Sequence, residues 1–206
     1  AGSYGKKTMI SDSFDLDIVI YYPSNSKNTI KETYCEVESA LSRQGYRHFR
    51  KSVAIRLNFD GGFHVDIVPG KAQDNSFNYA TLYKSEEDST FQTSIKTHID
   101  NARRCRDIIR LMKIWKSLWQ NTCSSFTLEL LVVYGLWKTP INSYGDSMMK
   151  VLQYIRDNIL TVRLDDPANT NNILQVSSIE RSQLQRTAVS SICFTSFLGA
   201  VISFRA

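Results

Sequence analysis

The sequence contains few cysteines and histidines, and they are not spaced as in a zinc site or a disulfide framework. Its four cysteines are dispersed along 206 residues without a C-x-x-C pair, and its three histidines are equally scattered. Clustered Cys and His residues are typical of zinc sites, and regularly spaced cysteines are typical of small secreted domains. The sequence therefore argues against both, and we expect a chain that works in the reducing cytoplasm.

The sequence also lacks a signal sequence at its N-terminal end and a long uninterrupted hydrophobic run. Its most apolar stretch, residues 188–204, holds four serines and a threonine and is bounded by Arg186 and Arg205. A membrane-spanning helix needs about 20 predominantly apolar residues. We therefore expect a buried C-terminal helix and no membrane segment.

Composition indicates an ordinary globular chain. Hydrophobic residues make up 42% and charged residues 22% of the sequence, so disorder is not expected to dominate. A chain of 206 residues forms one large domain or two small ones and buries most of its apolar surface. We find no internal repeat.

The net charge of +5 is unevenly distributed. Within residues 103–116, one acidic residue, Asp107, accompanies the basic residues Arg103, Arg104, Arg106, Arg110, Lys113 and Lys116. Such a segment is typical of a solvated helix face, but beside a carboxylate cluster it also suits a polyanion site. Both interpretations stay open on charge alone.

The first half of the sequence has the patterns of a small sheet. Residues 16–22 are β-branched and aromatic and end at Pro23, which predicts a strand. Residues 30–44 have helical spacing. Residues 52–59 and 63–68 alternate around the turn at 60–62, which predicts a hairpin. Residues 71–97 are weakly patterned, and we expect a loop.

The second half has the pattern of a helical bundle. Apolar residues recur at helical spacing over 98–119, 126–137, 148–159 and 177–204. The polar residues 165–172 predict a loop. We assign Trp115, Trp119 and Trp137 to the core. A small mixed sheet followed by helices is an α+β arrangement.

Three carboxylates mark the candidate chemistry. Asp15 and Asp17 lie two apart at the start of the first strand, so their side chains point to the same face. Asp66 lies in the second hairpin strand, between apolar neighbours, where an unpartnered carboxylate is costly to bury. If the strands lie side by side, the three carboxylates meet and need a cation between them. Magnesium and manganese are the ions that such oxygen ligands prefer.

Together these residues resemble a known family. Gly2-Ser3, then Asp15-x-Asp17, then Val65-Asp66-Ile67-Val68-Pro69, is similar to the nucleotidyltransferase superfamily of DNA polymerase beta. The similarity is greatest to the branch that contains 2'-5'-oligoadenylate synthase, cyclic GMP-AMP synthase, bacterial cyclic-oligonucleotide synthases and archaeal CCA-adding enzymes. The resemblance implies catalysis by Asp15, Asp17 and Asp66 with two Mg²⁺ or Mn²⁺ ions, and triphosphate binding by Gly2 and Ser3.

Two helical segments extend the resemblance. The stretch from Ile109 to Trp115 resembles the helix that carries a triphosphate-binding lysine, here Lys113. The segment 124–129 resembles the start of the next helix, where Ser125 would bind triphosphate and Phe126 would stack on a base. By themselves, Lys113 is compatible with an exposed lysine, Ser125 with a helix N-cap and Phe126 with plain core.

The resemblance implies a polymerase-beta-type palm over residues 1–97 and a helical domain over 98–206 that completes the nucleotide site. Family members carry a long helix before the Gly-Ser motif, and we expect it to be missing here. The segment from 79 to 99 is similar to bacterial members of the branch.

The resemblance thus predicts an enzyme that joins nucleoside triphosphates, ATP among them, into a cyclic di- or oligonucleotide messenger for antiphage defence. A regulatory protein partner stays open. One alternative is an RNA or tRNA terminal nucleotidyltransferase, the reading in which nucleic acid would be a partner. A second is a non-catalytic nucleotide-binding module, against which the three mutually repelling carboxylates argue.

Overall fold

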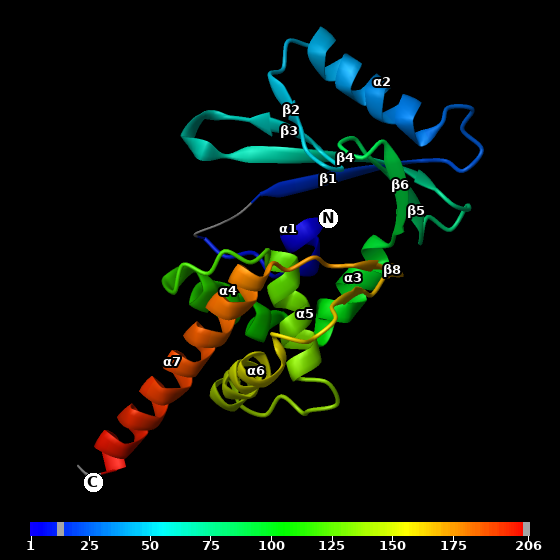
Figure 1. Ribbon diagram of the computed structural model, residues 1–206. Helices are drawn as coiled ribbons and strands as arrows, with labels where there is room; N and C mark the ends of the chain where they lie inside the picture. The colour runs from blue at the N-terminus through cyan, green and yellow to red at the C-terminus, as the bar shows by residue number, and fades with distance from the viewer. Residues whose placement is uncertain (12–14, 204–206) are drawn as a thin grey trace. The chain divides into compact units, whose positions relative to one another are not determined.

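The chain forms two compact units in a computed structural model that describes residues 1–11 and 15–203, with side chains through residue 194 (Figure 1). The first unit comprises residues 1–101 and 167–172, and the second comprises residues 102–166 and 173–206. The predicted α+β fold class is confirmed. The assignment of residues 1–97 as a catalytic palm and 98–206 as its helical partner stays a prediction.

A six-stranded mixed sheet forms the frame of the first unit. Five strands follow the order β2-β3-β4-β5-β6 with antiparallel neighbours, and β1 pairs parallel with β4 (Figure 1). Their bounds are β1 Leu16–Tyr22, β2 His48–Arg50, β3 Ile55–Asn58, β4 His64–Ala72, β5 Ala80–Lys84 and β6 Ser89–Thr93. The central strand β4 therefore has β1 along one side and β3 and β5 along the other.

Helix α2 (Ile30–Arg43) covers one face of this sheet. A capping box starts the helix: the Thr29 hydroxyl accepts from the Glu32 amide, and the Glu32 carboxylate accepts from the Thr29 amide. The apolar residues of the sheet that face α2 form a core with it, composed of Ile30, Tyr34, Val37, Ile55, Leu57, Val65, Ile67 and Tyr83. Because strand residues alternate faces, Asp66 points away from α2.

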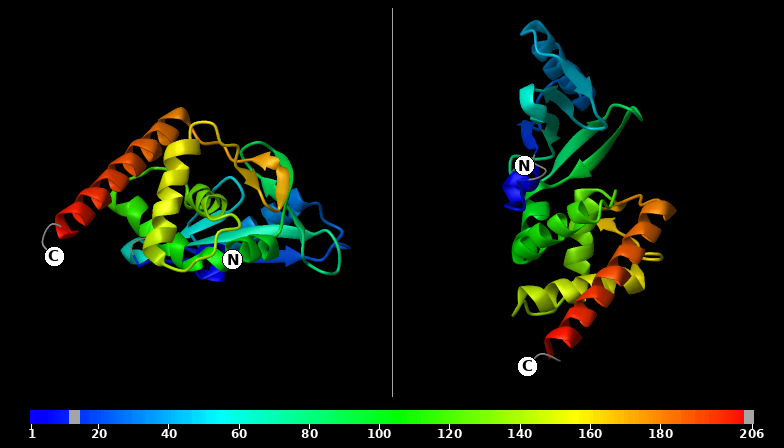
Figure 2. Two further views of the ribbon diagram at one scale, coloured as in Figure 1. Left: turned by 90° about the horizontal axis from the view of Figure 1, so that it is seen from below. Right: turned by 90° about the vertical axis from the view of Figure 1, so that its left-hand side faces the viewer.

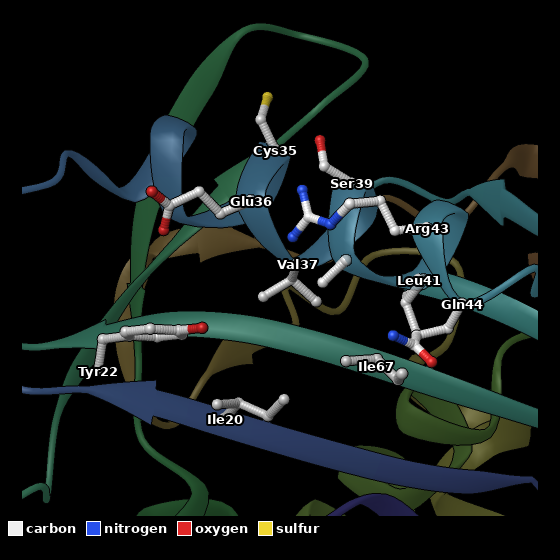
Figure 3. Close-up of a pocket in the computed structure, with 11 residues that line it drawn as sticks. Ile20, Tyr22, Cys35, Glu36, Val37, Ser39, Leu41, Arg43, Gln44 and Ile67 are labelled. Atoms are coloured by element: carbon white, nitrogen blue, oxygen red, sulfur yellow. The ribbon is translucent and has the colours of Figure 1, made fainter.

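A groove lies between α2 and the sheet on that covered face (Figure 3). Its volume is about 750 Å³, and side chains from α2 line it opposite Ile20 and Tyr22 of β1 and Ile67 of β4. The carboxylates Asp17 and Asp66 belong to the opposite face by alternation. The groove is therefore separate from the predicted site.

Helices make up the second unit. The elements are η2 (Arg103–Cys105), α4 (Arg106–Leu118), α5 (Ser125–Gly135), α6 (Tyr144–Asn158) and α7 (Ser178–Ser203). Helices α6 and α7 lie side by side (Figure 2). The core contains Ile108, Ile109, Met112, Leu128, Leu131, Val151, Ile155 and Leu184, all at most 5% exposed.

Several short elements complete the chain. They are α1 (Gly2–Lys6), η1 (Asp60–Gly62), α3 (Ile95–Ala102), β7 (Asp165–Asp166) and β8 (Asn169–Ile173). Within the described residues, every helix is too short or too polar to cross a membrane. For the C-terminal helix, burial is confirmed on one side at Leu184 and Ala188, whereas Val189 and Phe194 are exposed.

The strand at 16–22, the helix at 30–44, the hairpin over 52–68 and the later helices are confirmed as elements. In four places, however, the predicted extent of an element or the predicted loop was wrong. Strand β4 does not end before Pro69 but continues to Ala72, since β1 pairs along its whole length. The expected loop at 71–97 contains the β5–β6 hairpin. A turn of 3₁₀ helix at 103–105 interrupts the expected helix 98–119, and the expected loop 165–172 contains β7 and β8. For β4, a pairing partner distant in sequence decided the outcome, whereas the β5–β6 and β7–β8 pairs join neighbouring segments of the chain.

Two of the three tryptophans were also wrongly assigned to the core. Trp115 is buried, and its indole N–H donates to the Ser191 hydroxyl over 2.9 Å. Trp119 is 41% exposed and Trp137 is 67% exposed, because each follows the last turn of its helix. Helical spacing identifies a face, but not the point at which the helix reaches the surface.

Candidate metal centre

Parallel pairing between β1 and β4 places two of the predicted carboxylates side by side. Asp17 and Asp66 are direct partners in the register, and Asp15 lies one residue before β1. Asp66 is 9% exposed. The predicted strand contact therefore forms.

A metal-ligand cluster results, though its membership differs from the predicted trio. One ligand atom each from Asp15, His64 and Asp66 lies within 4.8 Å of the others. His64, the first residue of β4, points to the same face as Asp66, and its Nε2 atom is 3.2 Å from Asp15 Oδ2. These atoms fit a divalent cation, since carboxylate oxygen and imidazole nitrogen both coordinate such ions.

Asp17 is directed toward the Gly-Ser motif. A Cβ atom on Gly2 would lie 1.6 Å from Asp17 Oδ2, so any other residue at position 2 would collide with this carboxylate. Gly2 also has φ +51°, in the left-handed region that glycine tolerates best. The glycine is thus explained by close approach. Ser3 follows in α1, in the same unit.

Arg56 brings a positive charge into direct contact with the cluster. It is the antiparallel partner of Asp66, and its Nε and Nη2 atoms donate to the two Asp66 oxygens over 2.7 and 2.6 Å. Its Nη2 also lies 3.9 Å from Asp15 Oδ2. These hydrogen bonds to Asp66 raise the pKa of the Arg56 guanidinium. Bidentate pairing holds Asp66 in one orientation.

The cluster still disfavours ionised Asp17. Burial, and then the negative charges of Asp15 and Asp66, raise the pKa of the Asp17 carboxyl above its ordinary value of 3.8. Desolvation and like charge both penalise the anion. A divalent cation would remove much of this penalty, which is the electrostatic signature expected of a metal-binding carboxylate.

The remaining predicted residues belong to the helical unit. Lys113 is 8% exposed on α4, so it is not a plain solvated lysine. Ser125 is the first residue of α5, and its neighbour Ser124 is the N-cap, accepting from the Thr127 amide over 2.9 Å. Phe126 is partly buried against the helical core. That Lys113, Ser125 and Phe126 bind a nucleotide stays a prediction.

The sequence patterns did not identify Arg56 or His64 as members of the carboxylate cluster. A signal for both was present: a hairpin centred on Gly61 pairs residue 58 with 64 and 56 with 66. That symmetry puts Arg56 directly beside Asp66 on the polar face. The register had to be assumed, however, and without it the arginine had no identifiable partner.

Comparison with known proteins agrees with the predicted resemblance. No protein-family model matches the chain. The CBASS oligonucleotide cyclase CdnC of Escherichia coli (strain KTE188) is 24% identical in an alignment that is 240 residues long with its gaps. The alignment covers 96% of this chain and 75% of that protein.

Solved structures share the fold. The E. coli MS115-1 CdnC in complex with HORMA-deltaN matches 91% of this chain and 72% of its own, with a TM-score of 0.70 and 19% identity. The Vibrio cholerae cyclic AMP-GMP synthase DncV, bound to nonhydrolyzable GTP, matches 90% of this chain and 59% of its own, with a TM-score of 0.69 and 18% identity. The fold implied by the sequence motifs is confirmed.

Proposed function

We propose that this chain, a nucleotidyltransferase of the polymerase-beta-like superfamily that resembles its bacterial oligonucleotide cyclases, joins nucleoside triphosphates into a cyclic di- or oligonucleotide messenger. Pyrophosphate would be released at each step, and the messenger would serve antiphage defence. The observation that carries the proposal is the carboxylate cluster on β1 and β4, in a chain similar over 96% of its length to an E. coli oligonucleotide cyclase.

Asp15, Asp17 and Asp66 would hold two Mg²⁺ or Mn²⁺ ions. Such ions lower the pKa of an attacking hydroxyl and neutralise charge on the triphosphate and the departing pyrophosphate. Asp66 would act as the base that accepts the hydroxyl proton. Its orientation by Arg56 supports this role, since a general base must be held within reach of the proton.

Five residues would bind the nucleotide. Gly2 allows close backbone approach, and the Ser3 hydroxyl would bind phosphate oxygens. Lys113 would supply a positive charge to the triphosphate. The start of α5 would place Ser125 and nearby amides toward phosphate, since helix N-termini favour anions. Phe126 would stack on a base.

ATP is the first substrate to test. A regulatory protein partner also belongs to the proposal, because the similar E. coli CdnC was solved in complex with HORMA-deltaN. A cytoplasmic location belongs to it as well. In support, all four cysteines, each among the described residues, are free.

Product analysis tests the proposal directly. The chain is incubated with α-labelled nucleoside triphosphates and Mg²⁺ or Mn²⁺, without nucleic acid, and the products are treated with phosphatase. We expect phosphatase-resistant label that Asp15→Asn/Asp17→Asn abolishes. The matched control Asp60→Asn/Asp157→Asn removes two exposed carboxylates outside the cluster and should retain the product.

Other outcomes would identify the alternatives. Label that forms once RNA is added, and then by linear extension, would favour a terminal nucleotidyltransferase. Nucleotide binding that needs no metal and gives no product would favour a non-catalytic module. Either result would overturn the messenger-synthase proposal.

A further inference from the structure

His64 lies where a metal ligand would lie. It begins β4, and alternation along the strand places its side chain beside Asp66 on the polar face of the sheet. Asp15 immediately precedes β1, the parallel neighbour of β4. Its Oδ2 atom is 3.2 Å from His64 Nε2, and the ligand atoms of the three residues lie within 4.8 Å of one another.

The Nε2 atom of His64 is enclosed but unsatisfied. It is buried, and no described residue forms a hydrogen bond of acceptable geometry with it, despite its proximity to Asp15. A buried polar atom without a partner costs about 1–3 kcal/mol, so most such atoms in native proteins have one. An imidazole nitrogen this close to the Asp15 and Asp66 carboxylates would acquire a partner in a cation bound among the three groups.

Asp66 can contribute to such a site without releasing Arg56. The guanidinium uses one lone pair on each Asp66 oxygen, and an ionised carboxylate offers about four acceptor positions. A cation and Arg56 can therefore share Asp66. The cation would add positive charge to a cluster whose three carboxylates are close enough for Asp15 and Asp66 to raise the pKa of Asp17.

We propose that His64 Nε2 is a direct ligand of the metal ion held by Asp15 and Asp66, and that it shifts the preference of this site from Mg²⁺ toward Mn²⁺. The inference rests on the proposed metal-dependent function and names the ion of that site. Its physical basis is ligand chemistry: Mg²⁺ favours an all-oxygen shell, whereas transition-metal ions such as Mn²⁺ bind N/O sites.

Mn²⁺ by itself is the probe, and electron paramagnetic resonance is the readout. Pulsed spectra of Mn²⁺ bound to the chain should show modulation from a directly coordinated ¹⁴N nucleus. His64→Gln, which offers oxygen in place of nitrogen, should lose that modulation and bind Mn²⁺ at least tenfold more weakly. The apparent affinity for Mg²⁺, measured by competition, should change less than twofold.

His48→Gln is the matched control. His48 also lies on a strand with its Nε2 near a carboxylate, 3.7 Å from Glu38 Oε1, and belongs to no metal cluster among the described residues. Its variant should retain both the ¹⁴N modulation and the Mn²⁺ affinity. Thermal unfolding without metal would establish that both variants are folded.

The possible failures are distinguishable. Mn²⁺ that binds the chain, is lost in Asp15→Asn, but shows no ¹⁴N modulation would overturn the role of His64 and leave the proposed function standing. An unchanged Mn²⁺-to-Mg²⁺ preference in His64→Gln would do the same. Failure of the chain to bind Mn²⁺, or binding indifferent to Asp15→Asn, would overturn the metal site and the proposed function with it.

Discussion

Replacing Arg56 by glutamine would remove the cation that is hydrogen-bonded to Asp66 in the carboxylate cluster. The variant keeps a polar side chain but loses the bidentate bond to Asp66. Without metal, Asp66 would then lose its cationic hydrogen-bond partner while it stays close to Asp15 and Asp17. We expect the free energy of unfolding to fall in the presence of EDTA and to recover when Mn²⁺ is added.

The degree of burial sets the size of the effect. Breaking a fully buried ion pair costs about 3–5 kcal/mol, and breaking an exposed one costs about 0–1 kcal/mol. The Arg56 and Asp66 side chains are 24% and 12% exposed, so we expect a loss of about 2 kcal/mol in EDTA. With saturating Mn²⁺, the difference from the parent chain should fall below about 1 kcal/mol, because the ion supplies the missing charge.

Urea unfolding curves with EDTA and with Mn²⁺ measure both quantities. Arg50→Gln is the control, since Arg50 makes a similar bidentate bond to Glu38 but is 52% exposed and outside the cluster. It should cost less than about 1 kcal/mol, independently of metal. An Arg56→Gln deficit that is equal with and without Mn²⁺ would refute the reasoning, because Arg56 would then be purely structural.

Three further predictions follow from individual residues. Gly2→Ala should lower the rate of nucleotide joining at least tenfold, because the added Cβ displaces the Asp17 carboxylate. In the control Gly5→Ala, the added Cβ meets nothing closer than 3.8 Å, and the rate should not fall. Initial rates of the two variants give the comparison. In EDTA, Asp17→Asn should raise the free energy of unfolding at pH 7, because a folded-state pKa above 3.8 makes the ionised form destabilising. This gain should shrink toward pH 3.8 in urea titrations and would be absent if Asp17 were solvated. Burial raises the pKa of the Cys123 thiol to about 11, so about a thousandth of the Cys123 side chains are thiolate at pH 8. A thiol reagent should therefore modify the exposed Cys193 before Cys123. Equal modification rates at the two cysteines would contradict the burial of Cys123.

Local sequence patterns determined the elements that need no distant partner. Strand β1 was predicted with its observed bounds because β-branched and aromatic residues end at a proline. Helix α2 was predicted to within a residue, since its apolar spacing and its stop at Gly45 are both local. The Asp-x-Asp pair and Asp66 were identified in the same way, by alternation within each strand.

Local patterns failed where pairing with another strand decided the structure. The β5–β6 hairpin lies in a polar stretch, and β5 forms because it pairs with β4. Strand β4 continues through Pro69 because β1 accompanies it. In both places, hydrogen bonds to an adjacent strand of the sheet stabilise an extended backbone that the residues by themselves do not favour.

The carboxylates, the glycine-serine motif and the family resemblance could be read from the sequence, because the residue types and their spacing already define that chemistry. The tertiary structure alone decided what surrounds each carboxylate. The parallel register puts Asp66 beside Asp17, the hairpin puts Arg56 on Asp66, and the two together enclose His64 next to Asp15. The β1–β4 register depends on packing between strands far apart in the chain, and a shift of one residue would turn the side chains of the shifted strand to the opposite face.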